Sequence, residues 1–295
     1  MKKKMLTIIT PTYNRGYILK KLYDSLRIQT YKNFEWIIVD DGSTDYTEGK
    51  VDIWKKEKNE FEISYLYQEN GGKHKAINNA VSKAKYPYVY IIDSDDYMVE
   101  DAVESIYSWI KSIDNKEEFV GIAGLRGTSK TDTIGEFPEN LESIDSSNLE
   151  RKKNNLRGDK AEVFKKEVLK NYPFPEFENE NFLLESAVWD KIAYDGFKIR
   201  WFNKIICITN YLDDGLTKNN DELKTKNFKG YTFVEKQNLN IQKFPYNFLA
   251  IGRYLKIAKK KGLSNKEVEG ILDINQVQLM VGKFLDALAS TMKRE

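Results

Sequence analysis

Cysteine and histidine are almost absent from this sequence of 295 residues. Because Cys207 is the only thiol, the chain forms no internal disulfide, which excludes a disulfide-built secreted scaffold. Because His74 is the only imidazole, a multi-histidine metal centre and a two-histidine zinc motif are excluded too. Any metal site must therefore consist of carboxylate oxygens and oxygens of a bound ligand.

Long apolar runs are missing as well. No stretch approaches the roughly 18 to 20 uninterrupted apolar residues of a membrane span. The N-terminus is basic like that of a signal peptide, but its apolar core is short, β-branched and ends at Pro11. We therefore expect a first buried strand of a cytoplasmic protein.

Net charge is also small, because 47 Lys and Arg face 45 Asp and Glu, for a formal +2. The distribution is uneven: residues 241–295 carry ten basic and five acidic residues, net +5, which leaves −3 for the remainder. Basic residues on a tail beside an acidic body are not typical of a nucleic-acid-binding protein. We expect no nucleic-acid partner.

Short apolar runs alternate with amphipathic stretches over the first 125 residues. The strands are expected at Met5–Thr10, Phe34–Asp40, Ile63–Tyr67, Tyr88–Asp93 and Phe119–Leu125. The helices are expected at Tyr17–Gln29, Thr44–Lys58, Lys73–Ala84 and Asp101–Ile113. This alternation predicts an α/β fold with an open, mostly parallel sheet and flanking helices.

The rest of the chain is less regular. Residues 127–155 form a long polar stretch without a clear period. Beyond it we expect helices at Lys160–Asn171 and Glu185–Tyr194 and a pair of strands at Phe197–Phe202 and Ile205–Tyr211. After Lys218 the pattern turns helical, with helices at Tyr246–Lys261 and Ser264–Thr291, the second opened by a capping box.

Polar residues follow the strands of the first half. They stand in the segments 11–15, 40–43, 68–73 and 93–96. Each segment alone is an ordinary turn or helix cap. All of them at the carboxyl edge of one sheet predict a ligand site, because ligands of open α/β sheets bind there.

The acidic segment is the strongest of these signals. Asp93, Asp95 and Asp96 repel one another unless a cation lies among them, and a divalent metal with phosphate oxygens meets that need. The alternative is an acidic surface turn, which the apolar strand before it disfavours. Asp41 can accept from uracil or ribose, and Tyr13 can stack on a base.

These motifs together resemble those of family-two glycosyltransferases with the GT-A fold. The residues that carry the resemblance are Thr10–Arg15, Val39–Asp45, Gly71–Lys73 with Ala76 and Asn78, and Asp93–Asp96. The resemblance implies a metal-dependent, inverting transfer of one hexose or N-acetylhexosamine from a UDP-sugar to a glycan or lipid-linked acceptor in surface polysaccharide biosynthesis. Processive members carry membrane helices and a Gln-x-x-Arg-Trp motif, and neither is present, so we expect a non-processive enzyme.

The resemblance also implies roles for individual residues. Those expected to contact the UDP-sugar are Pro11, Tyr13, Asp41, Lys73, Asp93 and Asp159. Asp95 would hold Mn²⁺ or Mg²⁺. The general base would be Glu185, with Glu180 as the alternative. A loop at 211–217 would close over the diphosphate.

We expect a catalytic domain at 1–218, with a nucleotide-binding half at 1–125 and an acceptor half at 126–218, and a helical region at 219–295. The basic helix after Pro245 either docks on the catalytic domain or meets anionic lipid, and the last helix can alternatively form a homodimer. Two rival functions stay open: a sugar-phosphate nucleotidyltransferase, although its Gly-rich phosphate loop is missing, and a non-catalytic nucleotide-sugar or glycan-binding module.

Overall fold

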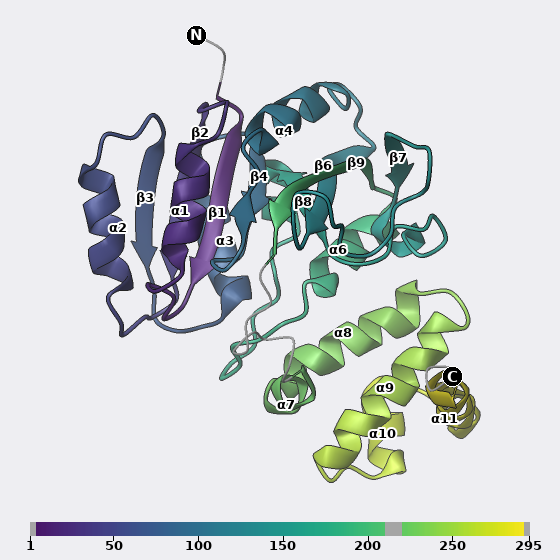
Figure 1. Cartoon of the computed structure of the whole chain (residues 1–295). Helices are drawn as coiled ribbons and strands as arrows, with labels where there is room; N and C mark the ends of the chain where they lie inside the picture. The colour runs from purple at the N-terminus through teal and green to yellow at the C-terminus, as the bar shows by residue number, and fades with distance from the viewer. Residues whose placement is uncertain (1–3, 210–219, 292–295) are drawn as a thin grey trace. The chain divides into compact units, whose positions relative to one another are not determined.

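The computed structural model in Figure 1 describes residues 4–209 and 220–291. Its first half forms four parallel strands in the order β3-β2-β1-β4. These strands are β1 (Leu6–Thr12), β2 (Phe34–Asp40), β3 (Glu62–Tyr67) and β4 (Tyr88–Ile91). The helices between them are α1 (Leu19–Arg27), α2 (Thr47–Lys56) and α3 (Lys73–Lys83). The predicted α/β class is confirmed.

Beyond β4 the sheet continues with strands of both directions. They are β5 (Tyr97–Met98), β6 (Phe119–Gly127), β7 (Ser143–Ser146), β8 (Lys160–Lys165) and β9 (Lys198–Ile208), with α4 (Ala102–Lys111) before β6 and a short 3-10 turn, η1 (Asn148–Glu150), after β7. The strand order is β3-β2-β1-β4-β8-β6-β9-β5, with β7 beside β9. Strand β8 runs antiparallel to both β4 and β6, whereas β6 and β9 are parallel.

Helices cover both faces of the first four strands. Buried residues of α1, α2 and α4 share one apolar core with Leu6, Ile8 and Trp36. Helix α3 also contacts β1 and β2, but its buried side chains lie outside this core. Because neighbouring residues of a strand point to opposite faces, α3 covers the other face. Burial on both faces explains the continuous apolar run of β2.

Two expected elements differ from the structure. The helix predicted at Lys160–Asn171 is a strand, β8, followed by a short helix, α5 (Lys166–Asn171). Residues Lys160–Lys165 form backbone hydrogen bonds with β4 and β6, and this pairing determines their conformation in spite of the helical pattern of their sequence. The two strands predicted around Trp201 form one strand, β9, whose register against β6 shifts instead of breaking. The end of that prediction, residues 210–211, lies outside the described residues.

The chain divides into two compact units. Within the described residues, the first unit comprises 4–174 and 195–209, and the second comprises 175–194 and 220–291. The second unit is helical and contains α6 (Ser186–Tyr194), α7 (Asn220–Lys226), α8 (Phe228–Ile241), α9 (Tyr246–Lys260), α10 (Asn265–Leu272) and α11 (Gln276–Thr291). The helix α6, which we expected in the acceptor half, groups with the C-terminal helices. No helix of the described chain is long and apolar enough to cross a membrane.

The predicted last helix is two helices. The capping box of Ser264 and Glu267 opens α10 as expected. The helix ends at Asp273, whose left-handed backbone (φ 54°) redirects the chain into α11. The single helix predicted at Ser264–Thr291 is therefore interrupted at Asp273.

Candidate active site

The polar ends of β1, β2 and β4 meet at one edge of the sheet, as predicted. Pro11 is buried within β1, and Tyr13 follows it with 48% of its surface exposed. Asp41 follows β2, and its backbone N–H donates to the carbonyl of Thr12 at 2.8 Å. The exposed ring of Tyr13 is available for stacking.

The side chain of Asn14 joins the first two loops. Its backbone adopts a left-handed conformation (φ 52°), which asparagine tolerates. Its Oδ1 accepts from the backbone N–H groups of Thr44 at 2.8 Å and Asp45 at 3.3 Å. In turn the Ser43 hydroxyl accepts from the Asn14 N–H at 2.7 Å. These contacts fix the loop on which Tyr13 stands.

Asp41 is buried and holds the double-glycine loop. Its carboxylate accepts from the backbone N–H groups of Gly71 at 2.9 Å and Gly72 at 2.7 Å. The amide groups of Gln68 (2.7 Å) and Asn70 (3.3 Å) complete its shell. A single carboxylate thus sets the loop that leads into α3.

Lys73, the first residue of α3, reaches the acidic cluster from that loop. Its Nζ lies 2.5 Å from Oδ1 of Asp93, and Nη1 of Arg126 lies 3.7 Å from the other oxygen. Burial alone would raise the pKa of Asp93, but the charges of Lys73 and Arg126 outweigh it and hold the pKa below its ordinary value. Two cations of the protein therefore compensate the charge of Asp93.

Asp95 and Asp96 occupy different environments. Burial raises the pKa of Asp95, and the charge of Asp93 adds to the effect, while Arg15 lies 4.0 Å away. Asp96 is 2% exposed, and burial raises its pKa to about 7 although Arg126 bonds to its Oδ2. The three carboxylates of the cluster therefore differ in acidity.

Arg126, at the end of β6, is a site residue that the sequence analysis did not single out. It is largely buried, contacts two carboxylates of the cluster, and donates through Nε to the carbonyl of Lys160 at 3.0 Å. Its signal in the sequence is a cation that directly follows an apolar strand. Arg15 belongs to the motif Thr10–Arg15, but the sequence predicts no role for its side chain, which lies beside Asp95.

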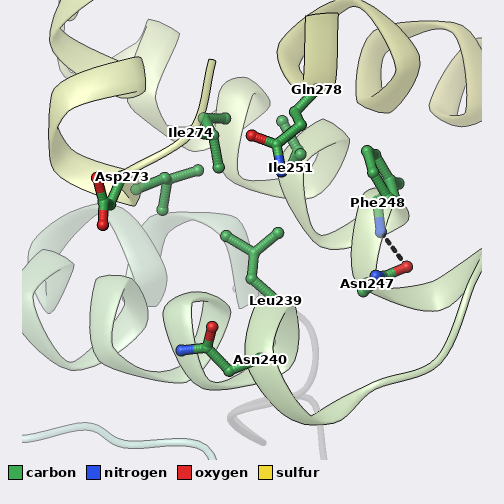
Figure 2. A pocket seen from close by; sticks show the side chains of 9 residues that line it. Leu239, Asn240, Asn247, Phe248, Ile251, Asp273, Ile274 and Gln278 are labelled. Atoms are coloured by element: carbon green, nitrogen blue, oxygen red, sulfur yellow. Dashed lines mark hydrogen bonds between the residues drawn. The ribbon is translucent and has the colours of Figure 1, made fainter.

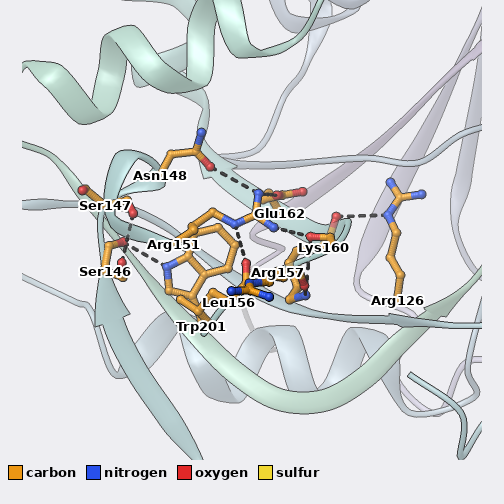
Figure 3. Close-up of polar contacts among 11 residues, drawn as sticks. Arg126, Ser146, Ser147, Asn148, Arg151, Leu156, Arg157, Lys160, Glu162 and Trp201 are labelled. Atoms are coloured by element: carbon orange, nitrogen blue, oxygen red, sulfur yellow. Dashed lines mark hydrogen bonds and ion pairs between the residues drawn. The ribbon is translucent and has the colours of Figure 1, made fainter. Parts of the chain in front are cut away.

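Figure 3 shows the polar network that holds the segment before β8. The guanidinium of Arg151 lies over the ring of Trp201 at 5.0 Å. Lys160 is buried and donates through Nζ to the carbonyl of Arg157. Burial lowers the pKa of Lys160 to about 8, and the charge of Arg151 acts in the same direction. Asp159, predicted to bind the donor sugar, is exposed next to this fixed lysine.

Both candidate bases belong to the helical unit. Glu180 is buried, and its two carboxylate oxygens accept from the backbone N–H groups of Lys229 at 2.7 Å and Gly230 at 2.8 Å. It therefore caps the N-terminus of α8. Glu185 directly precedes α6 and is half-buried.

Figure 2 shows a pocket of about 110 Å³ among α8, α9 and the segment between α10 and α11. Its lining is apolar or amide, and Asp273 is the one titratable side chain among its lining residues. This lining offers neither an acid–base pair nor a metal site. In the described part of the chain, no three acidic, histidine or cysteine side chains are grouped as a ready metal site either.

Comparison with known proteins gives the family. Glycosyltransferase GlyG of Streptococcus pneumoniae is 37% identical over 112 residues, which is 38% of this chain and about a third (36%) of GlyG. The putative teichuronic acid biosynthesis glycosyltransferase TuaG of Bacillus subtilis is 26% identical over 262 residues, 88% of this chain and 98% of TuaG.

The fold comparison agrees with the sequence comparison. S. aureus TarS 1-349 in complex with UDP superposes with a TM-score of 0.62 at 16% identity, over 91% of this chain and 80% of that one. The family model "Glycosyl transferase family 2" matches residues 7–171, which is more than half of the chain. The resemblance and the GT-A fold are thus confirmed, and this protein belongs to glycosyl transferase family 2.

Proposed function

We propose that this protein transfers one hexose or N-acetylhexosamine from a UDP-sugar to a glycan or lipid-linked acceptor, with inversion, in surface polysaccharide biosynthesis. The observation that carries the proposal is the acidic cluster of Asp93, Asp95 and Asp96, which lies with Lys73 and Arg126 at the ligand-binding edge of the sheet. The names of TuaG and of the TarS complex support the pathway and the nucleotide.

A divalent metal fits the residues present. Asp95, with Asp93 beside it, offers the hard oxygens that Mn²⁺ and Mg²⁺ prefer, and the raised pKa of Asp95 reflects a carboxylate that an added cation would stabilise. With Asp95 as the protein ligand, the remaining ligands would be diphosphate oxygens and water. Such a metal would stabilise the charge that grows on the departing UDP.

The nucleotide would bind on the first two loops. Uracil would stack on Tyr13 and donate a hydrogen bond to the carboxylate of Asp41. The longest hydrogen bond that this carboxylate now accepts comes from the Asn70 amide at 3.3 Å, and the uracil N–H would replace it. Lys73 would turn from Asp93 toward the diphosphate, and Asp93 would face the ribose. Pro11 would line the base, and Asp159 would contact the sugar. The cytoplasmic location stays a prediction.

Glu185 is the proposed base on the acceptor hydroxyl, because the alternative, Glu180, already uses both oxygens to cap α8. We expect Glu185→Gln to reduce transfer at least about a hundredfold while UDP affinity stays unchanged. The assay measures UDP release from a panel of UDP-sugars with Mn²⁺ and simple acceptors, and titration calorimetry measures UDP binding.

Glu180→Gln is the matched control. It should lower stability by about 1 kcal/mol through the cap of α8 and leave the transfer rate of the folded protein close to that of the wild type. Transfer by Glu185→Gln at the wild-type rate would contradict the base assignment. Metal-dependent UDP binding without turnover on any donor would instead favour the non-catalytic binding module.

A further inference from the structure

Helix α11 carries a row of exposed apolar side chains from Val277 to Leu288. Val277, Met280, Phe284 and Leu288 recur at helical spacing and are 69%, 63%, 63% and 45% exposed. A helix on the surface of a protein ordinarily turns its polar face outward. We call these four residues the α11 stripe. An exposed apolar patch of this kind marks an interaction site.

The charged residues of α11 lie off the stripe. Asp286 pairs with Lys256 of α9 at 2.8 Å, and Lys283 lines a groove of about 200 Å³ between the two helices. The opposite side of α11 packs closely against α9, because a Cβ on Gly282 would lie only 2.6 Å from the side chain of Ile251. The close helix contact and the ion pair fix which side of α11 faces outward.

The positive charge beside the stripe comes from that groove. Lys259 and Lys283 line it, and neither side chain forms an ion pair with the residues described, 4–209 and 220–291. By contrast, the cations of α9, which one of the two alternatives placed against lipid, pair with acids of the same unit: Arg253 with Glu235, Lys256 with Asp286, and Lys260 with Asp221. The lipid-facing candidate is therefore α11 and not α9.

The exposed apolar area of the stripe favours a lipid surface over a second copy of the chain as its partner. Four side chains that are about half exposed offer on the order of 400–500 Å² per copy, whereas a stable dimer buries about 800 Å² per partner. An interfacial helix needs no such area, because its apolar face enters the headgroup boundary while neighbouring lysines meet anionic phosphates. The net +5 of residues 241–295 acts in the same direction.

We propose that α11 is an interfacial membrane anchor, in which the stripe of Val277, Met280, Phe284 and Leu288 inserts into an anionic lipid surface and Lys259 and Lys283 contact its phosphates. This inference concerns where the protein resides and does not depend on the transfer reaction.

The test is co-sedimentation of the full chain with vesicles of phosphatidylcholine alone and of phosphatidylcholine with phosphatidylglycerol. We expect binding to the anionic vesicles that weakens with salt, and roughly tenfold or greater loss in Phe284→Glu. The matched control is Ile53→Glu, an exposed apolar residue of α2, which should bind like the wild type. Lys283→Glu should weaken binding to the vesicles that contain phosphatidylglycerol and leave any binding to phosphatidylcholine alone unchanged.

A direct readout of insertion uses the burial of Cys207, which leaves an introduced cysteine as the reactive thiol. An environment-sensitive dye on Phe284→Cys should shift to the blue with anionic vesicles, and the same dye on Ile53→Cys should not. No binding at low salt, or wild-type binding by Phe284→Glu, would overturn the proposal. A concentration-dependent dimer that Phe284→Glu abolishes, without vesicle binding, would also overturn it and assign the stripe to a second copy.

Discussion

At the scale of single residues, Arg126 supports the acidic cluster most directly. It contacts Asp93 and Asp96 from a largely buried position. Removing one partner of a buried ion pair leaves an uncompensated charge, which costs about 3–5 kcal/mol. We therefore expect Arg126→Gln to lower the free energy of unfolding by about that amount, measured by urea denaturation at about pH 8.5, where Asp96, with its pKa of about 7, is ionised beside Arg126.

The control for Arg126 is Lys130→Gln. Lys130 pairs with Glu100 at 3.2 Å on the exposed surface, where an ion pair contributes less than about 1 kcal/mol. Adding Asp96→Asn to Arg126→Gln should restore part of the loss, because the orphaned charge is removed. Equal losses in Arg126→Gln and Lys130→Gln would disprove the role of Arg126.

The buried Lys160 should make the stability of the protein depend on pH. Its folded pKa of about 8 lies below the ordinary value of about 10.4, so between these values the unfolded chain binds more protons than the folded protein. Stability contributed by this residue is therefore lowest at and below neutral pH and rises as pH increases from about 8 to 10.4.

Comparison of wild type with Lys160→Met isolates that effect. The stability of the wild type relative to the variant should increase by about 3 kcal/mol between pH 7 and pH 10.5, since one pKa unit corresponds to about 1.4 kcal/mol. Urea unfolding at several pH values within this range measures it. Parallel stability profiles for the two proteins would show that Lys160 is not titrating as stated.

The placement of candidate residues that directly follow strands could be predicted from the sequence, because a polar residue after an apolar run is visible locally. Asp41, Asp93 and Asp95 are of this kind, and the structure brings their strand ends to one edge. Arg126 follows the same rule at the end of β6, but its link to Asp96 depends on the strand order, with β8 between β4 and β6. That order cannot be read from local pattern.

At the scale of elements, the loops of the site depend on backbone conformations that only glycine adopts easily. Gly42 has φ +86°, and a Cβ there would lie 2.8 Å from the backbone nitrogen of Asn70. Gly42→Ala should lower the free energy of unfolding by about 1–3 kcal/mol and weaken UDP binding, because the neighbouring Asp41 would shift. Thermal unfolding and calorimetry with UDP measure both effects.

Gly49 of α2 provides the matched comparison. A Cβ there meets nothing within 4 Å, and its φ lies outside the left-handed range. Gly49→Ala should therefore stabilise the protein by roughly 0.5–1 kcal/mol through helix propensity and leave UDP binding unchanged. A loss of UDP binding in Gly49→Ala would show that the effect at Gly42 is not specific to the loop.

Element types were predicted correctly where periodicity was long and local, as in the first four strands and their helices. The error at β8 has a physical cause. Its sequence alternates, with Ala161 and Val163 buried, but it is only six residues long and precedes a true helix. Its identity is decided by antiparallel pairing with β4 and β6, which a single segment does not reveal.

At the scale of the whole molecule, the two units differ in the evidence they carry. The family model ends at residue 171, close to where the first unit gives way to α6, so the residues proposed to bind the nucleotide lie within the part of the chain that matches the family. The helical unit contains Glu185, the α11 stripe and the basic segment 241–295 at net +5, but its acidic segment 175–194 at net −4 offsets most of that charge. The small net charge of the chain is thus the sum of a C-terminal segment at +5 and a remainder at −3, and this division by charge does not follow the division into units.

If the acidic cluster loads a metal together with a nucleotide, ligands should stabilise the first unit selectively. A ligand at about a hundred times its Kd adds about 2.7 kcal/mol to the free energy of unfolding. We expect UDP with Mn²⁺ to slow amide hydrogen exchange in the loops at 11–15, 40–43 and 68–73, and to leave α9 and α11 unchanged. Asp95→Asn should remove the Mn²⁺-dependent part and retain the protection by UDP alone, because Tyr13 and Asp41 stay in place. Equal protection of both variants by Mn²⁺ would locate the metal away from Asp95.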